Sequence, residues 1–442
     1  MHVVRRPMLT TLDRRIVGLA LPALGALIVE PLYNLTDTAI VGHLGRTPLG
    51  GLALASTVLN LLGWTAAFLQ MATTSRVAFR RGQRDHAGAA EAAVAGYVVA
   101  LGLGVIVAIL VGFAGPPLAH LLSGHGDVQR SATTYLRISA FGMPFLLLTL
   151  AGTGHLQGEE DTRTPLRIVF IANIVNIALE LALVYGVHLG IAGSAWGTVI
   201  AQAVAATLFV VASARRVSLA TSRPSRMEYV VLLRNGLALV VRTVALGAAL
   251  VTSTAIAAQV GSATLAAHQI ALQVWILLAL TLDALAVPAQ VYVGAALGSE
   301  DAIEAAEVGR RCLRLGLVVS LLVGALTMAL APALPYLFTN DGDVRSIATV
   351  GLLLCGALQP FAAIAFVLDG LLLGAADYAV LRRSMLLALL AFAPFAIATL
   401  ADHRLGIAGI WLALTCWLMA RCFLLGRSWL RRTTTVRTAV RS

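Results

Sequence analysis

The sequence predicts an all-α integral membrane protein with twelve transmembrane helices, arranged as two parallel repeats of six helices. Composition and an internal repeat predict this fold class. Hydrophobic residues make up 59% of the chain and charged residues only 12%, against about 45–50% and about 25% in soluble domains. The charges gather in short gaps between long apolar runs. Because lipid offers backbone amides no hydrogen-bond partner, these runs must be helices.

The second half of the chain repeats the first half at a constant shift of 216 residues. LGIAG occurs at Leu189–Gly193 and again at Leu405–Gly409, and GDV occurs at Gly126–Val128 and again at Gly342–Val344. The same register pairs further residues: Gly45 with Gly261, Asp85 with Asp301, Gly158 with Gly374, and Asp161 with Asp377. A repeat of this length is too long for a solenoid and indicates two fused domains.

Each repeat contains six apolar runs, each long enough to cross a bilayer core of about 30 Å. In the first repeat they lie near 14–42, 48–75, 88–113, 131–155, 164–187 and 190–214. In the second repeat they lie near 229–259, 264–297, 308–331, 346–374, 380–401 and 404–427. Because six is an even number, both repeats enter the membrane from the same side and are parallel.

Arginine sets the predicted orientation, since the chain contains no lysine. With a cytoplasmic N-terminus, the outer loops hold only five arginines: Arg46, Arg130, Arg137, Arg345 and Arg404. This bias places both termini in the cytoplasm of a multi-pass protein of the inner or plasma membrane. The net charge of +11 then faces anionic lipid and does not indicate nucleic acid. The predicted domains are an N-terminus (1–13), an N-terminal lobe (14–214), a linker (215–228), a C-terminal lobe (229–427) and a basic tail (428–442).

Ionisable residues inside the predicted spans are the candidate functional residues, because a charge at a helix centre costs at least about 2.5–3.5 kcal/mol. The first span places Glu30, Asn34 and Asp37 on one face. The fifth span does the same with Asn173, Asn176 and Glu180, and the sixth with Thr198 and Gln202. Three spans of one repeat therefore each present a polar face.

The depths of three of these residues agree. At about 1.5 Å per residue, Asp37, Glu180 and Thr198 all lie roughly 8–12 Å below the outer surface. Two carboxylates and a hydroxyl at one level predict a proton- or cation-coupling site, which we assign to Asp37, Glu180, Asn176, Thr198, Asn34 and Asn173. The alternative is that each side chain is capped locally and only orients helix packing.

The second repeat has lost this acidic site. The repeat register maps Asp37 onto Ser253, Glu180 onto Ala396 and Asn176 onto Phe392. The eighth span instead carries a polar stripe, with His268 nearby: Gln269, Gln273, Asp283 and Gln290. We interpret the stripe as the lining of a substrate cavity, or alternatively as a hydrogen-bonded helix seam. The predicted cavity residues are Gln269, Gln273, Asp283, Trp275, Gln202, Glu30 and Tyr33.

Arg242 lies deep in the seventh span and needs a partner, for which Asp283 and Asp369 are candidates; we expect a neutral structural pair. No GxxxxGK, HExxH or GxSxG motif occurs, and the four cysteines lack metal-ligand spacing. We therefore expect no cofactor, no metal and no enzymatic activity. Transport would draw on a gradient of protons or sodium ions.

Six stretches resemble one family of transporters. They are PLYNLTDTAIVGHLG (31–45), LQGEEDTRTPL (156–166), NIVNIALE (173–180), GIAGSAWGTVIAQ (190–202), LAAHQIALQVW (265–275) and LDGLLLGAAD (368–377). The pattern resembles the multidrug and toxic compound extrusion (MATE) family, and most of all its DinF-like branch. The resemblance implies two six-helix bundles that form a V around a central cavity. It also implies export of small, often cationic and lipophilic compounds in exchange for protons or sodium ions.

The resemblance makes Asp37 the counterpart of the family's essential aspartate and places Asn176, Glu180 and Thr198 in its polar network. Glu180 stands where several members of the family have Asp. Two further departures matter: the fourth span (131–155) has no Asn, and the seventh span has no carboxylate after Glu228. The last departure leaves the sodium site of the C-terminal lobe incomplete, which favours protons. We expect a monomer whose partners are small-molecule substrates and the bilayer. The alternatives are a flippase for lipids or lipid-linked sugars, and a lipid-modifying membrane enzyme.

Overall fold

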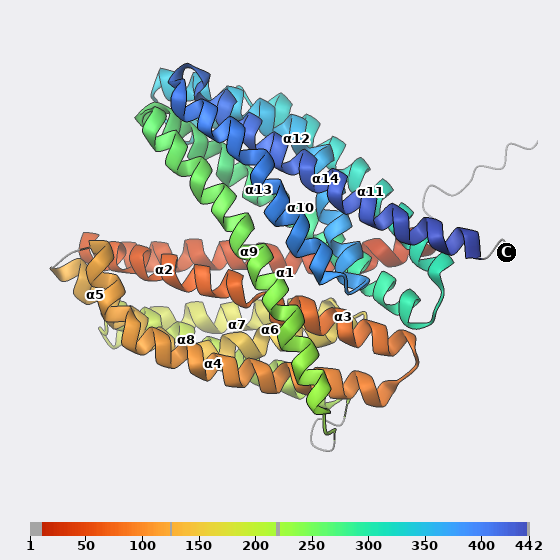
Figure 1. Cartoon of the computed structure of the whole chain (residues 1–442). Helices are drawn as coiled ribbons and strands as arrows, with labels where there is room; N and C mark the ends of the chain where they lie inside the picture. Colours follow the sequence, from red (N-terminus) through yellow and green to blue (C-terminus); the bar gives the residue numbers. More distant parts are fainter. Residues whose placement is uncertain (1–10, 124–125, 218–221, 440–442) are drawn as a thin grey trace, which may run out of the picture. The chain divides into compact units, whose positions relative to one another are not determined.

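The computed structural model describes residues 11–123, 126–217 and 222–439. Within these ranges the chain is helical apart from short turns, and no strand is present (Figure 1). Eleven of the described helices are long and apolar enough to cross a membrane, and a bent pair makes up to twelve. The predicted all-α membrane fold is confirmed.

The helices follow the two predicted repeats in order. Those of the first repeat are α1 (Thr11–Gly42), α2 (Arg46–Ala66), α3 (Phe68–Gly82), α4 (His86–Ser123), α5 (Asp127–Ala140), α6 (Met143–Gly158), α7 (Arg163–Leu181) and α8 (Ile191–Ala214). Those of the second are α9 (Arg226–Val260), α10 (Ser262–Gly298), α11 (Ala302–Leu330), α12 (Gly342–Gly374), α13 (Tyr378–Ala401) and α14 (Gly406–Ala439). A π-helix (Ala182–Gly186) continues α7, and two 3-10 turns (Leu334–Leu337, His403–Leu405) lie in the second repeat.

Two predicted spans are not single helices. The span expected at 131–155 is the bent pair α5 and α6, whose axes differ by 53°. Pro144 stands in the first turn of α6, and its ring removes a backbone donor and clashes with the carbonyl four residues earlier. The span expected at 48–75 runs on to Gly82 and is interrupted at Ala67, where α2 gives way to α3.

The repeat is also visible in the backbone at the turns between helices. Arg84 and Glu300 have φ of 58° and 61°, and Glu160 and Ala376 have φ of 60° and 53°. Both pairs are equivalent under the 216-residue shift. Two ion pairs that join such a turn to a residue 55 positions later are equivalent too: Asp161 with Arg216, and Asp377 with Arg432.

The described residues form two compact units. The N-terminal unit contains Pro22–Leu237, and the C-terminal unit contains the described residues of 1–21 and of 238–442. The predicted lobe borders, at 14–214, 215–228 and 229–427, stay predictions. Residues 1–10, 218–221 and 440–442, which belong to the predicted N-terminus, linker and tail, lie outside the described residues.

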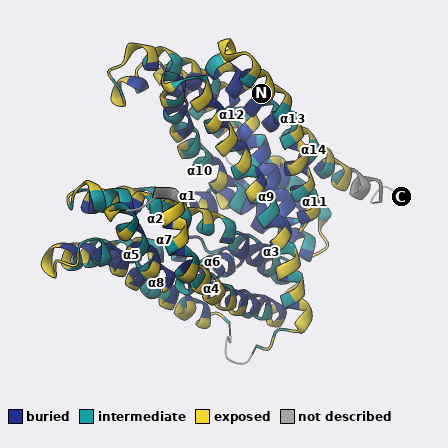
Figure 2. Cartoon of the chain, turned by 60° about the vertical axis from the view of Figure 1, so that its left-hand side comes forward, coloured by how far each residue is buried: buried dark blue, intermediate teal, exposed yellow. Residues whose placement is uncertain are grey.

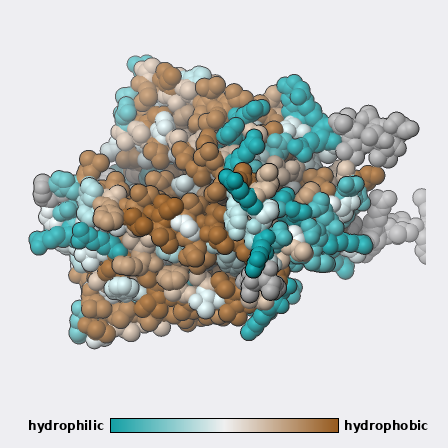
Figure 3. Space-filling view, turned by 60° about the horizontal axis from the view of Figure 1, so that its bottom comes forward, coloured by the Kyte–Doolittle hydropathy of each residue, from teal (hydrophilic) through white to brown (hydrophobic). Residues whose placement is uncertain are grey.

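Each unit has its own apolar core, and hydrophobic residues also cover outer faces. Leu52, Tyr135 and Leu136 belong to a core of the N-terminal unit, and Trp411 and Leu352 belong to that of the C-terminal unit. Figure 2 shows buried residues along helix faces inside each unit. Exposed hydrophobic side chains are numerous (Figure 3), as expected for helices that face lipid acyl chains.

Candidate functional site

The predicted acids meet inside the N-terminal unit, where α1, α5, α7 and α8 converge. Asp37 of α1 is 5% exposed. Its carboxylate accepts a hydrogen bond from the Ser194 hydroxyl of α8 at 2.6 Å and a longer one from the Tyr135 hydroxyl of α5 at 3.5 Å. Asp37 is therefore held by two neighbouring helices.

Glu180 of α7 lies beside Asp37, close enough for the two carboxyl groups to interact directly. Glu180 is fully buried, and neither of its carboxyl oxygens has a side-chain or backbone donor among the described residues. The absence of a side chain at Gly197 makes this close approach to α8 possible, because a Cβ there would lie 2.9 Å from Cγ of Glu180. The residues that follow form the π-helix, a feature frequent at functional sites.

Thr198 connects α8 to α1 and α7. Its hydroxyl lies 2.8 Å from the Tyr33 hydroxyl, receives a weak hydrogen bond from the Asn176 amide at 3.5 Å, and donates to the Ser194 carbonyl at 3.2 Å. The side-chain oxygen of Asn176 is buried and has no partner among the described residues. This oxygen and the free carboxyl oxygens of Glu180 are the groups that could hold a proton or a small cation.

Four of the six residues predicted for coupling come together: Asp37, Glu180, Asn176 and Thr198. Asn173 instead donates to the Val169 carbonyl of its own helix at 2.8 Å, and Asn34 is exposed. Tyr33, predicted to line the substrate cavity, lies in this cluster. Of the other two cavity residues in this unit, Glu30 is exposed and Gln202 packs against Gly142 at the α5–α6 bend.

Two members of the cluster were absent from the sequence predictions, Ser194 and Tyr135. Ser194 precedes Thr198 by four residues and so shares its helix face. Tyr135 lies eight residues into α5, roughly 12 Å along the helix, which is the depth predicted for the acids. Helix face and depth in the membrane are therefore the sequence features that could have identified both residues as members of the cluster.

The C-terminal unit contains a separate charged cluster. Arg242 of α9 and Arg421 of α14 each donate to the same carboxylate oxygen of Asp369, on α12, at 2.5 Å. All three residues are at most 7% exposed. Of the two partners predicted for Arg242, Asp369 makes the direct pair, whereas Asp283 lies within electrostatic range of the cluster. Arg421 was not among the residues predicted from the sequence.

The counterpart of the acid cluster in the C-terminal unit is apolar apart from one pair. Ser253, which stands where the first repeat has Asp37, lies 3.2 Å from Nε2 of His268. Phe392, Ala396 and Leu414, the equivalents of Asn176, Glu180 and Thr198, are part of the hydrophobic core. The acid cluster is thus a property of one repeat.

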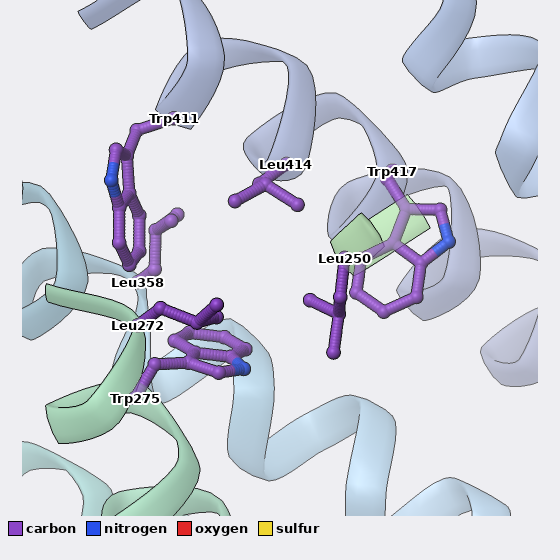
Figure 4. A pocket seen from close by; sticks show the side chains of 7 residues that line it. All are labelled: Leu250, Leu272, Trp275, Leu358, Trp411, Leu414 and Trp417. Carbon is purple, nitrogen blue, oxygen red and sulfur yellow. The ribbon is translucent and has the colours of Figure 1, made fainter. Parts of the chain in front are cut away.

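The polar stripe predicted along α10 changes exposure along its length. Gln273 and Asp283 are exposed, Gln269 is half-buried and Gln290 is buried. Trp275 lines a small apolar pocket whose other walls are Leu250, Leu272, Leu358, Trp411, Leu414 and Trp417 (Figure 4). The pocket is lined by leucine and tryptophan, so it does not join the stripe into one cavity. Across the described residues, no three His, Cys, Asp or Glu side chains gather as metal ligands do.

A helical membrane protein with a duplicated six-helix repeat and a buried acid pair in one half has the architecture of a secondary transporter. The family comparison agrees: the MatE family model matches residues 22–182 and 240–400. The chain belongs to the MatE family.

Individual relatives match over nearly the whole chain. Protein DETOXIFICATION 44, chloroplastic, of Arabidopsis thaliana is 31% identical over 92% of this chain and 80% of its own length. DNA damage-inducible protein F of Escherichia coli (strain K12) is 29% identical over 92% of this chain and 90% of its own length. A crystal structure of MATE in the bent conformation shares the fold, with a TM-score of 0.91, 22% identity and 98% of both chains covered.

Proposed function

We propose that this protein is a secondary active exporter that exchanges protons for small, lipophilic and often cationic molecules. The proposal rests on one observation above all: Asp37 and Glu180 are buried side by side, and no arginine of the described part of the chain forms a hydrogen bond with either. Two adjacent carboxylates repel each other when both are ionised in a poorly solvated site, so the pair binds a proton readily. The family supplies the transporter class, and the acid pair supplies the coupling chemistry.

The C-terminal unit supports protons over sodium as the coupling ion. Asp369, a buried acid of that unit, is already neutralised by two arginines. After Glu228, α9 contains no carboxylate that could complete a cation site. A sodium ion would have to bind in the N-terminal unit, on the oxygens of Asp37, Glu180, Asn176 and Thr198.

The mechanism follows from competition between proton and substrate. When the pair faces outward, it takes up a proton from outside, its negative charge decreases by one, and α1 rearranges about Pro31 to release the substrate. When the pair faces inward, the proton leaves to the cytoplasm and a new substrate molecule binds. By linkage, bound proton and bound substrate lower each other's affinity by the same factor. We also propose that both termini lie in the cytoplasm and that the protein resides in the inner or plasma membrane.

Proteoliposomes test the proposal directly. A fluorescent lipophilic cation is loaded, and a proton gradient or a sodium gradient is imposed separately. We expect efflux under the proton gradient alone. Asp37→Asn should lower that efflux to the level of empty liposomes, because the amide cannot take up a proton. The matched control is Asp402→Asn, an exposed aspartate at the start of a turn, which should transport normally. Wild-type efflux in Asp37→Asn would rule out the coupling role.

The flippase alternative has less support. A flippase for lipid-linked sugars would need basic groups that can reach an anionic headgroup. Arg242 and Arg421 are instead buried against Asp369. Flipping of a fluorescent lipid without any proton gradient would favour this alternative.

A further inference from the structure

The border between the two units falls inside two helices, at equivalent positions. It lies between Leu21 and Pro22 in α1 and between Leu237 and Ala238 in α9, and these positions are 216 residues apart. The first helix of each repeat therefore begins in the unit that the other repeat builds. The crossing segments, Thr11–Leu21 and Arg226–Leu237, each contain about three helical turns.

A buried glutamate and two half-buried arginines hold the crossing segment of α9 to the N-terminal unit. Glu228 is 4% exposed. It accepts two hydrogen bonds from Arg76, at 2.8 Å from Nε and 2.6 Å from Nη2, and one from Arg80 at 2.7 Å. Further along, Gly236 lies against the Phe68 ring, where a Cβ would come within 2.5 Å of ring atoms. Both arginines and Phe68 belong to α3, so one helix provides the whole anchor.

The crossing segment of α1 is held to the C-terminal unit in a similar way. Asp13 pairs with Arg311 of α11 at 3.2 Å, and Ile16 is fully buried. The Tyr292 hydroxyl donates to the Arg15 carbonyl at 3.4 Å. Tyr292 is the repeat equivalent of Arg76, so the same position of each repeat holds the crossing segment of the other.

Both crossing points contain a residue that weakens a helix. Pro22 of α1 has no amide hydrogen for the helical hydrogen bond and clashes with the preceding turn. Gly236 of α9 lowers helix stability by about 1 kcal/mol relative to alanine. Helices bend at such residues more easily than elsewhere. In α1 the residue that weakens the helix comes after the anchor, and in α9 it is the last contact of the anchor.

We propose that the crossing segment of α9 stays attached to α3 throughout the transport cycle, and that the two units move by bending α9 near Gly236. Glu228, Arg76 and Arg80 are then positioning residues for transport. The inference rests on the proposed function only in requiring alternation between two states; it does not depend on which ion is coupled.

Reversible cross-linking tests this anchor. In a background without the four native cysteines (Cys312, Cys355, Cys416 and Cys422), Glu228→Cys and Arg76→Cys are combined and joined by a short reducible bifunctional thiol reagent. Before cross-linking, we expect dye efflux about tenfold slower than in the background, because a loose tether no longer transmits the motion. Cross-linking should restore the rate and reduction should lower it again. A purely stabilising role would not produce this reversible rescue.

The opposite results would overturn the inference. If cross-linking abolishes efflux, the anchor must open in each cycle; if the double variant transports normally before cross-linking, the anchor is not needed. Failure of the cysteine-free background to transport any dye would instead count against the proposed function. Glu228→Gln, expected to be slower with unchanged dye affinity, covers the case in which the double variant does not fold. Its matched control is Asp127→Asn, since Asp127 also pairs with an arginine, Arg130, but within α5 alone and away from both anchors.

Discussion

At the scale of single residues, the buried acids Asp37 and Asp369 have opposite surroundings. Asp37 contacts hydroxyl groups and another carboxyl group, whereas Asp369 contacts two guanidinium groups. The first arrangement leaves room for a change of charge during transport. The second arrangement keeps Asp369 ionised, because loss of the carboxylate charge or of the guanidinium charges would leave the opposite charge without a partner in a poorly solvated site.

Asp369→Asn should therefore be strongly destabilising. It leaves Arg242 and Arg421 buried without a counter-ion, and breaking a buried pair of this kind costs about 3–5 kcal/mol. Replacing all three residues with Leu or Met of similar volume should instead be close to neutral. Thermal unfolding in detergent measures both. An Asp369→Asn variant that unfolds at the wild-type temperature would show that Asp283 or solvent already compensates the arginines.

At the scale of helices, the approach of α7 to α8 depends on Gly197. A Cβ at this position would lie 2.9 Å from Cγ of Glu180 and 3.3 Å from its amide nitrogen. Ser194 and Thr198 flank the glycine on the same face. One helix face thus provides both the gap that Glu180 fills and the hydroxyl groups that surround it.

Gly197→Ala should impair coupling more than folding. The added methyl group displaces Glu180 from Asp37, and we expect gradient-driven efflux to fall about tenfold, because misplaced reacting groups lose rate steeply. Gly102→Ala in α4, where a Cβ meets nothing within 4 Å, is the matched control and should transport normally. Efflux in proteoliposomes and the unfolding temperature are measured on both. Equal efflux in the two variants would contradict this role of Gly197.

The sequence predicted the helices better than their contacts. Hydropathy located the spans, and the 3.6-residue period placed Asp37, Glu180 and Thr198 on polar faces. Hydropathy did not detect the bend before Pro144, because it depends on composition and not on the direction of the helix axis. Ser194, Tyr135 and Arg421 became identifiable only once helix rotation was known, since hydroxyl groups occur in many helices and a partner for Arg421 lies 52 residues away.

At the scale of the whole molecule, the duplication preserved the turns and changed the interior. The ion pairs of Asp161 with Arg216 and of Asp377 with Arg432 occupy equivalent places. The acid cluster occurs in one repeat and the arginine cluster in the other. The ion pairs at the turns have the same place in both repeats, whereas the buried charged clusters inside the membrane differ between the repeats.

The turn pair of the first repeat should make stability depend on acid pH. Burial alone would raise the pKa of Asp161, but hydrogen bonds from Thr164 and then the charge of Arg216 outweigh it and hold the pKa below its ordinary value. The unfolded chain has the ordinary value of about 3.9. The stabilisation is therefore complete above about pH 4 and is lost as the pH falls through the lower folded-state pKa.

Asp161→Asn removes this dependence. Below about pH 4 the unfolding temperature of the variant should fall less steeply than that of the wild type, while at neutral pH the variant should be the less stable protein. Unfolding temperatures over a pH series measure the difference. Parallel curves for the two proteins would mean that Asp161 does not contribute to the acid sensitivity.

The exchange of first helices has a consequence for the ancestry of the fold. A single-repeat precursor with this topology would have had to bury its opening turns in a second copy of itself, as domain-swapped dimers do. Fusion of two such copies would make that partnership permanent and allow the copies to diverge. Either repeat produced alone should lack the helical turns that the other repeat contributes to its unit. We therefore expect the two repeats to fold into a complex only when both are present.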